Sequence, residues 1–96
     1  MADYREAWFK ENKSHYGWYT CVRCGKKIRK EDVDIDHIIP RSWGGRDNRN
    51  NLQCMCKWCN RSKGNDLGLH TIRDYSRNVR KNAVKDLKKT VKNLLK

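Results

Sequence analysis

The sequence predicts a small α+β domain, mostly helical, whose fold is completed by a bound metal ion. Two cysteine pairs, Cys21-x-x-Cys24 and Cys56-x-x-Cys59, enclose a segment with short strand-like runs, and helical patterns lie on either side of it. The chain has 96 residues, which is the size of one small domain. A chain this short buries limited apolar surface, so a metal site that staples the fold is expected.

The chain divides into three parts of one domain, residues 1–96. We expect an N-terminal helix and connector over residues 1–20, and Asp3 is placed to cap that helix. The cysteine-framed segment follows over residues 21–65, and a basic C-terminal helix covers residues 66–96. Apart from the helices, the expected regular structure is therefore concentrated in the middle part.

Within the middle part, alternation of residue types predicts two short strands, 33–36 and 52–55. Glycines, asparagines and arginines over residues 42–50 predict the loop that joins them. Residues 56–65 are expected to form a knuckle that leads into a short helix closed by Gly64.

The last part has the pattern of a long amphipathic helix from about Thr71. Its apolar stripe is formed by Ile72, Tyr75, Val79, Ala83, Leu87, Val91 and Leu94. Residues 70–96 hold nine lysines and arginines against two aspartates, so the opposite face is cationic. The stripe is expected either to pack on the core or to pair with a second subunit, and the chain is accordingly expected to be a monomer or a homodimer.

The composition favours a polyanionic partner. The formal net charge is +12 and the isoelectric point is about 9.8, a balance typical of proteins that bind nucleic acid. We expect no membrane span, because no apolar run approaches about 18 residues, and no secretory signal at the start. Five cysteines without such a signal favour a reducing, cytoplasmic location, where zinc is expected more than disulfides.

The four paired cysteines predict one tetrahedral zinc site, with Cys21, Cys24, Cys56 and Cys59 as thiolate ligands. Four sulfur ligands leave no open coordination position, so this zinc is expected to be structural. The pairs are separated by 31 residues, more than a simple double knuckle needs, and the excess must fold into something else. Cys54 is expected to be a small buried apolar residue instead of a ligand.

The segment between and after the cysteine pairs carries an ordered series of polar motifs. It reads D-I-D-H-I-I-P, then G-G, then N-N-L-Q, and finally C-K-W-C-N-R-S-K. These pieces resemble the HNH endonucleases, and specifically the zinc-stabilised branch with two CxxC pairs. The resemblance covers residues 21–65 and leaves out the flanking helices.

The resemblance implies a ββα-metal core, in which two antiparallel strands and a helix surround one catalytic divalent ion. Position by position, His37 matches the general base, and Asp36 and Asn60 match the ligands of the catalytic ion, Mg²⁺ or Mn²⁺. Asn51 matches the asparagine that ties the connecting loop. The third signature position holds Asn60 where other members have histidine, and an amide oxygen suits a hard ion.

Elementary chemistry agrees with these roles. Neutral imidazole accepts a proton near neutral pH, and a hard cation held by one carboxylate and one amide keeps positions open for phosphate and water. Successive strand residues point to opposite faces, so Asp36 and His37 are expected to converge through a bend at His37. Asp34 is expected either to orient His37 or to face solvent.

Cations that surround the motif and continue on the last helix are the expected contacts to nucleic acid. They are Arg41, Arg46, Arg49, Lys57, Arg61, Lys63, Arg77 and Lys81. Contacts of this kind fix the backbone of DNA without reading bases. Trp43, in the glycine-rich loop, is expected either to wedge against a groove or to have no such role, and Trp8, Trp18 and Trp58 are expected in the core.

The function predicted by these observations is a metal-dependent DNA endonuclease that hydrolyses phosphodiester bonds. One active site per chain makes nicking of double-stranded DNA the default. The alternatives are a zinc DNA-binding module without catalysis and an accessory subunit in a phage or mobile-element complex. Cleavage specificity, the physiological ion and the choice between DNA and RNA are not fixed by the sequence.

Overall fold

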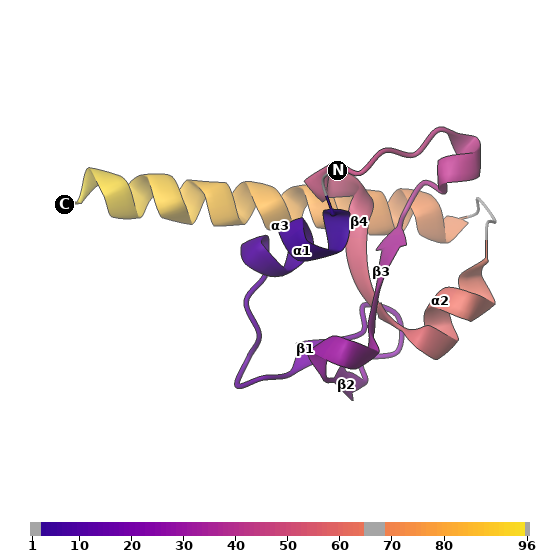
Figure 1. Ribbon diagram of the computed structural model, residues 1–96. Coiled ribbons are helices and arrows are strands. Elements are labelled where there is room, and N and C mark those ends of the chain that lie inside the picture. Colours follow the sequence, from indigo (N-terminus) through magenta and orange to yellow (C-terminus); the bar gives the residue numbers. More distant parts are fainter. Residues whose placement is uncertain (1–2, 65–68, 96) are drawn as a thin grey trace.

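The computed structural model describes residues 3–64 and 69–95, and its elements follow the expected order (Figure 1). The helices and strands are α1 (Tyr4–Glu11), β1 (Tyr19–Thr20), β2 (Lys27–Ile28), β3 (Val33–His37), β4 (Leu52–Cys56), α2 (Lys57–Lys63) and α3 (Leu69–Leu94). Short 3₁₀ turns occur at η1 (Lys30–Asp32), η2 (Arg41–Trp43) and η3 (Arg49–Asn51). Residues 65–68, where the expected junction before the last helix falls, lie outside the described residues.

The first helix begins where the sequence predicts it. The Asp3 side chain accepts a hydrogen bond from the Arg5 backbone N–H at 2.9 Å, which confirms it as the N-cap. The helix buries Phe9, whose ring lies 5.0 Å from that of Tyr19 on β1. Arg5 also donates to the backbone carbonyls of Val33 and, at 2.7 Å, Lys30. These contacts fasten α1 to the start of β3.

The two predicted central strands are confirmed and form an antiparallel pair. β3 and β4 are in register from Val33 opposite Cys56 to His37 opposite Leu52, so each strand runs one residue further than expected. Within the part of the chain that the structure describes, their sheet consists of these two strands, so the other edge of β3 is not paired with a strand. In Figure 1, β3 lies between β4 and α2, so strand, strand and helix form a ββα unit.

The connection between β3 and β4 is a loop, as predicted, but it contains the two turns η2 and η3. Gly44 ends η2 in the left-handed conformation, with φ of +87°. At Gly45 a side chain is excluded, because an added Cβ would lie 1.7 Å from the Ile39 carbonyl oxygen. The Asn48 side chain caps η3 by accepting from the N–H groups of Asn50 and Asn51. Local glycine and asparagine chemistry thus shapes this loop.

The core is small, and two of the three tryptophans expected in it lie outside. Ile38 and Met55 are completely buried, and Trp8 is partly buried against the core cluster. Trp18 is 40% exposed and Trp58 is 75% exposed, so the expectation for these two residues was wrong. The reason at Trp58 is its position between two cysteines whose sulfurs face inward, which places its indole on the outer face of α2.

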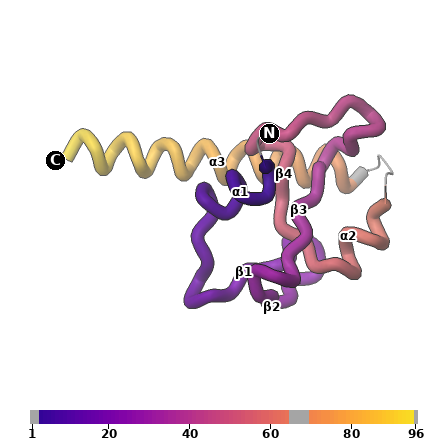
Figure 2. Tube along the Cα trace, in the orientation of Figure 1, coloured from indigo at the N-terminus to yellow at the C-terminus, as the bar shows by residue number. Residues whose placement is uncertain are grey.

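The long helix α3 is confirmed, but its apolar stripe does not face the core, which was one of the two arrangements expected for it. Ile72 and Leu87 of the apolar stripe are 74% and 64% exposed. The buried positions are Asp74 and Asn82, at 2% and 8%. Asn78 explains this arrangement, because its amide donates to the backbone carbonyls of Arg49, Asn50 and Leu52 and so replaces water there. The C-terminal half of α3 extends beyond the rest of the molecule (Figure 2).

Candidate functional site

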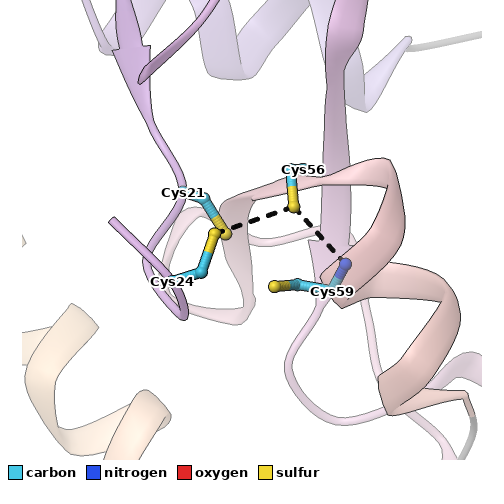
Figure 3. A group of neighbouring side chains, drawn as sticks. All are labelled: Cys21, Cys24, Cys56 and Cys59. Atoms are coloured by element: carbon cyan, nitrogen blue, oxygen red, sulfur yellow. Dashed lines mark hydrogen bonds between the residues drawn. The ribbon is translucent and has the colours of Figure 1, made fainter. Parts of the chain in front are cut away.

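The four paired cysteines meet at one point, as the sequence predicts. Their sulfur atoms all lie within 4.8 Å of one another, an arrangement that could hold one metal ion (Figure 3). The first pair lies in the turn between β1 and β2, and the second joins β4 to α2. Cys54 is not part of this group; it is 4% exposed in the core, and burial raises the pKa of its thiol to about 12.

Hydrogen bonds within the cluster prepare it for a cation. Burial alone would raise the pKa of the Cys21 thiol, but backbone N–H groups of Cys24, Cys56 and Arg23 bring it down to about 6. Burial and then the neighbouring sulfurs raise the pKa of Cys59 to about 12. Four thiolates cannot be held this close together without positive charge between them, and a metal ion supplies that charge.

The cluster also fixes where α2 begins. The Cys56 sulfur caps the helix by accepting from the Cys59 N–H at 3.4 Å. Gly25, with φ of +77°, closes the other knuckle through a bond from its N–H to the Cys21 carbonyl at 3.0 Å. Asn60 follows Cys59 directly in the chain. The sulfur cluster therefore determines the position of Asn60.

Three of the four predicted catalytic residues line one surface cavity. Asp36, His37 and Asn60 border a volume of about 370 Å³, together with Tyr4, Ile35, Pro40, Arg41, Arg61 and Gly64. The expected bend at His37 is not found, because β3 remains paired through His37 opposite Leu52. Side chains on opposite faces of β3 instead reach the same cavity because that cavity lies along the edge of the strand that is not paired with β4.

Asp36 is a buried carboxylate with two close partners. It is 5% exposed, and it accepts a hydrogen bond from Gln53 Nε2 at its Oδ2, 2.8 Å away. The Lys63 ammonium lies 3.2 Å from its Oδ1. Burial raises the pKa of Asp36, the bond from Gln53 and the charge of Lys63 oppose the rise, and the negative charge of Asp74 adds to it. The buried Asp36 carboxylate is thus compensated by the adjacent Lys63 ammonium and by the Gln53 amide.

A network that sequence reasoning missed stands behind Asp36. The Gln53 amide also contacts Asp74 Oδ2 at 3.3 Å, and Asp74 is paired with Arg23 at 3.0 Å and with Arg77 at 2.9 Å. Arg23 lies between the first two cysteines, so the network joins the sulfur cluster, α3 and Asp36. Asp74 is one of two aspartates in a basic helix, and this sequence signal does not identify its partners.

His37 has a carboxylate partner that was also missed. Its Nε2 lies 2.7 Å from Asp47 Oδ1, and Arg41 Nη2 contacts both oxygens of Asp47 at 2.8 and 2.9 Å. The bond from His37, together with the charge of Arg41, lowers the pKa of Asp47. An ionised carboxylate only accepts hydrogen bonds, so the contact with Asp47 favours the tautomer with the proton on Nε2. Arg41 Nε also lies 3.4 Å from Nε2, and this weaker contact favours the other tautomer, in which Nε2 accepts. The Tyr4 ring packs edge-on, 4.8 Å from the imidazole.

The two asparagines and Asp34 have distinct positions. Asn51, 2% exposed, donates to the carbonyls of Ile39 and Arg46 at 3.1 and 2.9 Å and accepts from the Ile39 N–H at 2.8 Å. Asn60 donates its amide N–H to Asp34 at 3.1 Å, which leaves its amide oxygen for another ligand. Asp34 thus contacts Asn60 and, at 3.6 Å, Lys57. These two contacts do not involve His37, so they give no support to the expectation that Asp34 orients the imidazole.

The predicted nucleic-acid contacts are spread over several places. Arg41 and Arg61 line the cavity, whereas the side chain of Lys63 is 6% exposed and points to Asp36. The others lie elsewhere: Arg46 is exposed, Arg49 pairs with Glu11 and Asp86, Lys57 with Asp34, Arg77 with Asp74, and Lys81 is exposed on α3. The structure therefore brings two of the eight to the mouth of the cavity.

Comparison with known proteins identifies the class of protein that this site defines. The family model described as HNH endonuclease matches residues 21–76, more than half of the chain, and the chain belongs to that family. A 46-residue stretch, 47% of the chain, is 46% identical to the CRISPR-associated endonuclease Cas9 of Corynebacterium diphtheriae. A stretch of the same length is 44% identical to the protein of the same name from Actinomyces naeslundii. The chain matches 4% of the length of each relative.

In residues 3–64 and 69–95, no helix is both long and apolar enough to cross a membrane.

Proposed function

We propose that this chain is a metal-dependent DNA endonuclease that hydrolyses phosphodiester bonds and nicks double-stranded DNA. The observation that carries the proposal is the meeting of Asp36, His37 and Asn60 at one cavity. A general base, a carboxylate and an amide oxygen are the groups that a one-ion phosphodiesterase requires. The net charge of +12 supports a polyanionic substrate.

His37 is the proposed general base, and Asp47 is proposed to hold it in the active tautomer. Because Nε2–H donates to Asp47, Nδ1 takes the proton from the attacking water. As His37 becomes imidazolium, the carboxylate 2.7 Å away stabilises the new positive charge. The edge-on contact with Tyr4 further restricts the ring.

Asp36 and Asn60 are the proposed holders of the catalytic ion, Mg²⁺ or Mn²⁺. Their oxygen atoms are hard ligands, and the Lys63 ammonium beside Asp36 shows that a positive charge is accommodated there. When bound, the ion supplies charge neutralisation for the phosphate and for the departing oxygen. Lys63 and Gln53 favour the ionised form of the buried carboxylate, and Asp34 turns the Asn60 amide so that its oxygen is available.

The sulfur cluster is proposed to hold structural zinc. Four thiolates close the coordination shell, so the ion there has no position for substrate. Its role is to hold the knuckle between β1 and β2 against α2 and thereby to place Asn60. Arg41 and Arg61, at the mouth of the cavity, are proposed to bind the phosphates on either side of the reacting one.

The test is cleavage of supercoiled plasmid by the zinc-loaded protein, with and without added Mg²⁺ or Mn²⁺, followed by analysis of the ends. We expect open circular product that appears only with the ion and carries 5′-phosphate and 3′-hydroxyl groups. Linear product formed in a single event would contradict the nicking mode. Binding of the plasmid without cleavage by any of these ions would contradict the endonuclease itself.

A further inference from the structure

A second pocket, away from the catalytic cavity, combines aromatic and cationic side chains. It has a volume of about 500 Å³ and lies between the β1–β2 hairpin and the start of α2. Its lining includes Trp18, Trp58, Lys26, Lys27, Arg29 and Lys57. Among the described lining residues, Asp32 is the one acidic side chain, so the pocket carries positive charge.

The two indoles are exposed although the domain has little apolar surface to bury. Trp58 is 75% exposed and Trp18 is 40% exposed. A large aromatic side chain left in water forgoes the free energy of burial, so a pair of them in a pocket indicates a surface for a ligand. Their flat rings select a flat partner, and the surrounding lysines select a negatively charged one.

The pocket is rigidly built. Trp18 is held by a two-residue turn, in which the backbone of His15 and Trp18 exchanges hydrogen bonds of 2.9 and 3.0 Å. Tyr16 and Gly17 both have positive φ, as such a turn requires. The Arg29 guanidinium lies 3.8 Å from the centroid of the Trp18 ring and donates to the Gly17 carbonyl at 3.3 Å. The Trp18 side of the pocket therefore requires little ordering when a ligand binds.

The pocket and the catalytic cavity share one short helix. α2 presents Lys57 and Trp58 to the pocket, and Asn60 and Arg61 to the cavity. A helix of 7 residues is about 10 Å long, so the two sites are close neighbours. The same polynucleotide strand can therefore occupy both.

We infer that this pocket binds an unpaired nucleotide of a single-stranded segment of DNA, with its base stacked on the tryptophans and its phosphates on the lysines. Bases in an intact duplex are stacked on one another and cannot reach an indole, whereas unpaired bases stack on aromatic side chains with little sequence preference. The inference rests on the proposed function for the identity of the ligand, and it adds a substrate feature, an unpaired strand beside the cut.

The test uses binding instead of cleavage, in a His37→Ala background without added divalent ion. Fluorescence anisotropy compares a labelled single-stranded oligonucleotide with one of equal length and equal phosphate number whose bases are removed. Trp58→Leu keeps an apolar side chain without a ring, and Trp58→Phe keeps a ring that can stack. Because Trp58 is largely exposed, both variants should fold, which thermal unfolding verifies.

We expect Trp58→Leu to weaken binding of the base-bearing strand about tenfold and to leave binding of the abasic strand unchanged. Trp58→Phe should retain most of the affinity for the base-bearing strand. Unchanged affinity in Trp58→Leu, or an equal loss on both strands, would overturn the inference and leave the indoles as a surface for another protein. Failure of the wild type to cut, with Trp58-dependent binding intact, would refute the endonuclease and not the pocket.

Discussion

Replacing Asp74 by asparagine tests how the basic helix is joined to the rest of the molecule. The Asp74 carboxylate is 2% exposed and holds Arg23 and Arg77 at 3.0 and 2.9 Å, with Gln53 at 3.3 Å. Asp74→Asn preserves the shape and removes the charge. Any effect therefore comes from the two charge-assisted contacts and not from lost volume.

The expected loss of stability follows from burial. Removing one partner of a fully buried ion pair costs about 3–5 kcal/mol, because the other charge stays buried. Here the side chains of Arg23 and Arg77 are 28% and 41% exposed and regain water, so we expect about 2 kcal/mol. For a domain of this size that loss lowers the melting temperature by about 10 °C.

The assay is urea unfolding of the zinc-loaded protein, followed by circular dichroism. Asp86→Asn is the matched control, because Asp86 lies on the same helix and pairs with Arg49 at 2.9 Å, but its side chain is 61% exposed. The control should lose about 0.5 kcal/mol or less. A loss below about 0.5 kcal/mol in Asp74→Asn, or equal losses in both variants, would refute the buried network as the anchor of α3.

Three further predictions concern the sulfur cluster, the loop and the Asp36 carboxylate. Cys59→Ser should release the zinc that we expect in the sulfur cluster and abolish the native near-ultraviolet circular dichroism, because the metal contributes about 10 kcal/mol or more to folding. A variant that is folded without zinc would contradict the structural role of the metal. Asn51→Ala should lower the free energy of unfolding by about 2–4 kcal/mol, because it leaves buried backbone groups of Ile39 and Arg46 without partners. Chemical denaturation measures this loss, and a value under about 1 kcal/mol would show that the Asn51 hydrogen bonds do not hold the loop. Burial raises the pKa of Asp36 above its ordinary 3.8, so protons compete for the carboxylate at higher pH than usual. Calorimetry on His37→Ala protein should therefore show that the affinity for Mn²⁺ begins to fall above pH 3.8 as the pH is lowered. An affinity that stays constant down to pH 3.8 would contradict the assignment of Asp36 as a ligand.

The features that the sequence predicted are those set by local spacing. The CxxC spacing brings the two sulfurs of each pair together, and the expected shared metal ion predicted that the two pairs meet. Asp3 and Gly64 cap the helices that directly follow or precede them. Strands 33–37 and 52–56 follow from alternation and from the turn signals between them. The meeting of three catalytic candidates at one cavity could also be predicted, because Asp36 and His37 lie at the end of one strand and Asn60 directly follows Cys59.

The features that it did not predict depend on contacts between distant residues. Asp74 lies 51 positions from Arg23 and 21 from Gln53, and no periodic pattern records such a pairing. The apolar stripe of α3 predicted either packing on the core or pairing with a second subunit. The contacts of the Asn78 amide with three backbone carbonyls instead dock a different face of the helix on the core. Trp58 was assigned to the core by its residue type, although the geometry of the cysteine pair turns it outward.

The most direct test of the proposed mechanism is the rate of plasmid nicking by His37→Ala beside that of His15→Ala. His15 is exposed and lies outside the catalytic cavity, so it controls for the general loss of an imidazole. The proposed mechanism predicts that His15→Ala nicks at the wild-type rate and that His37→Ala is slower by about 10²–10⁴-fold in saturating Mg²⁺ or Mn²⁺. Equal rates for the two variants would contradict the assignment of His37 as the general base.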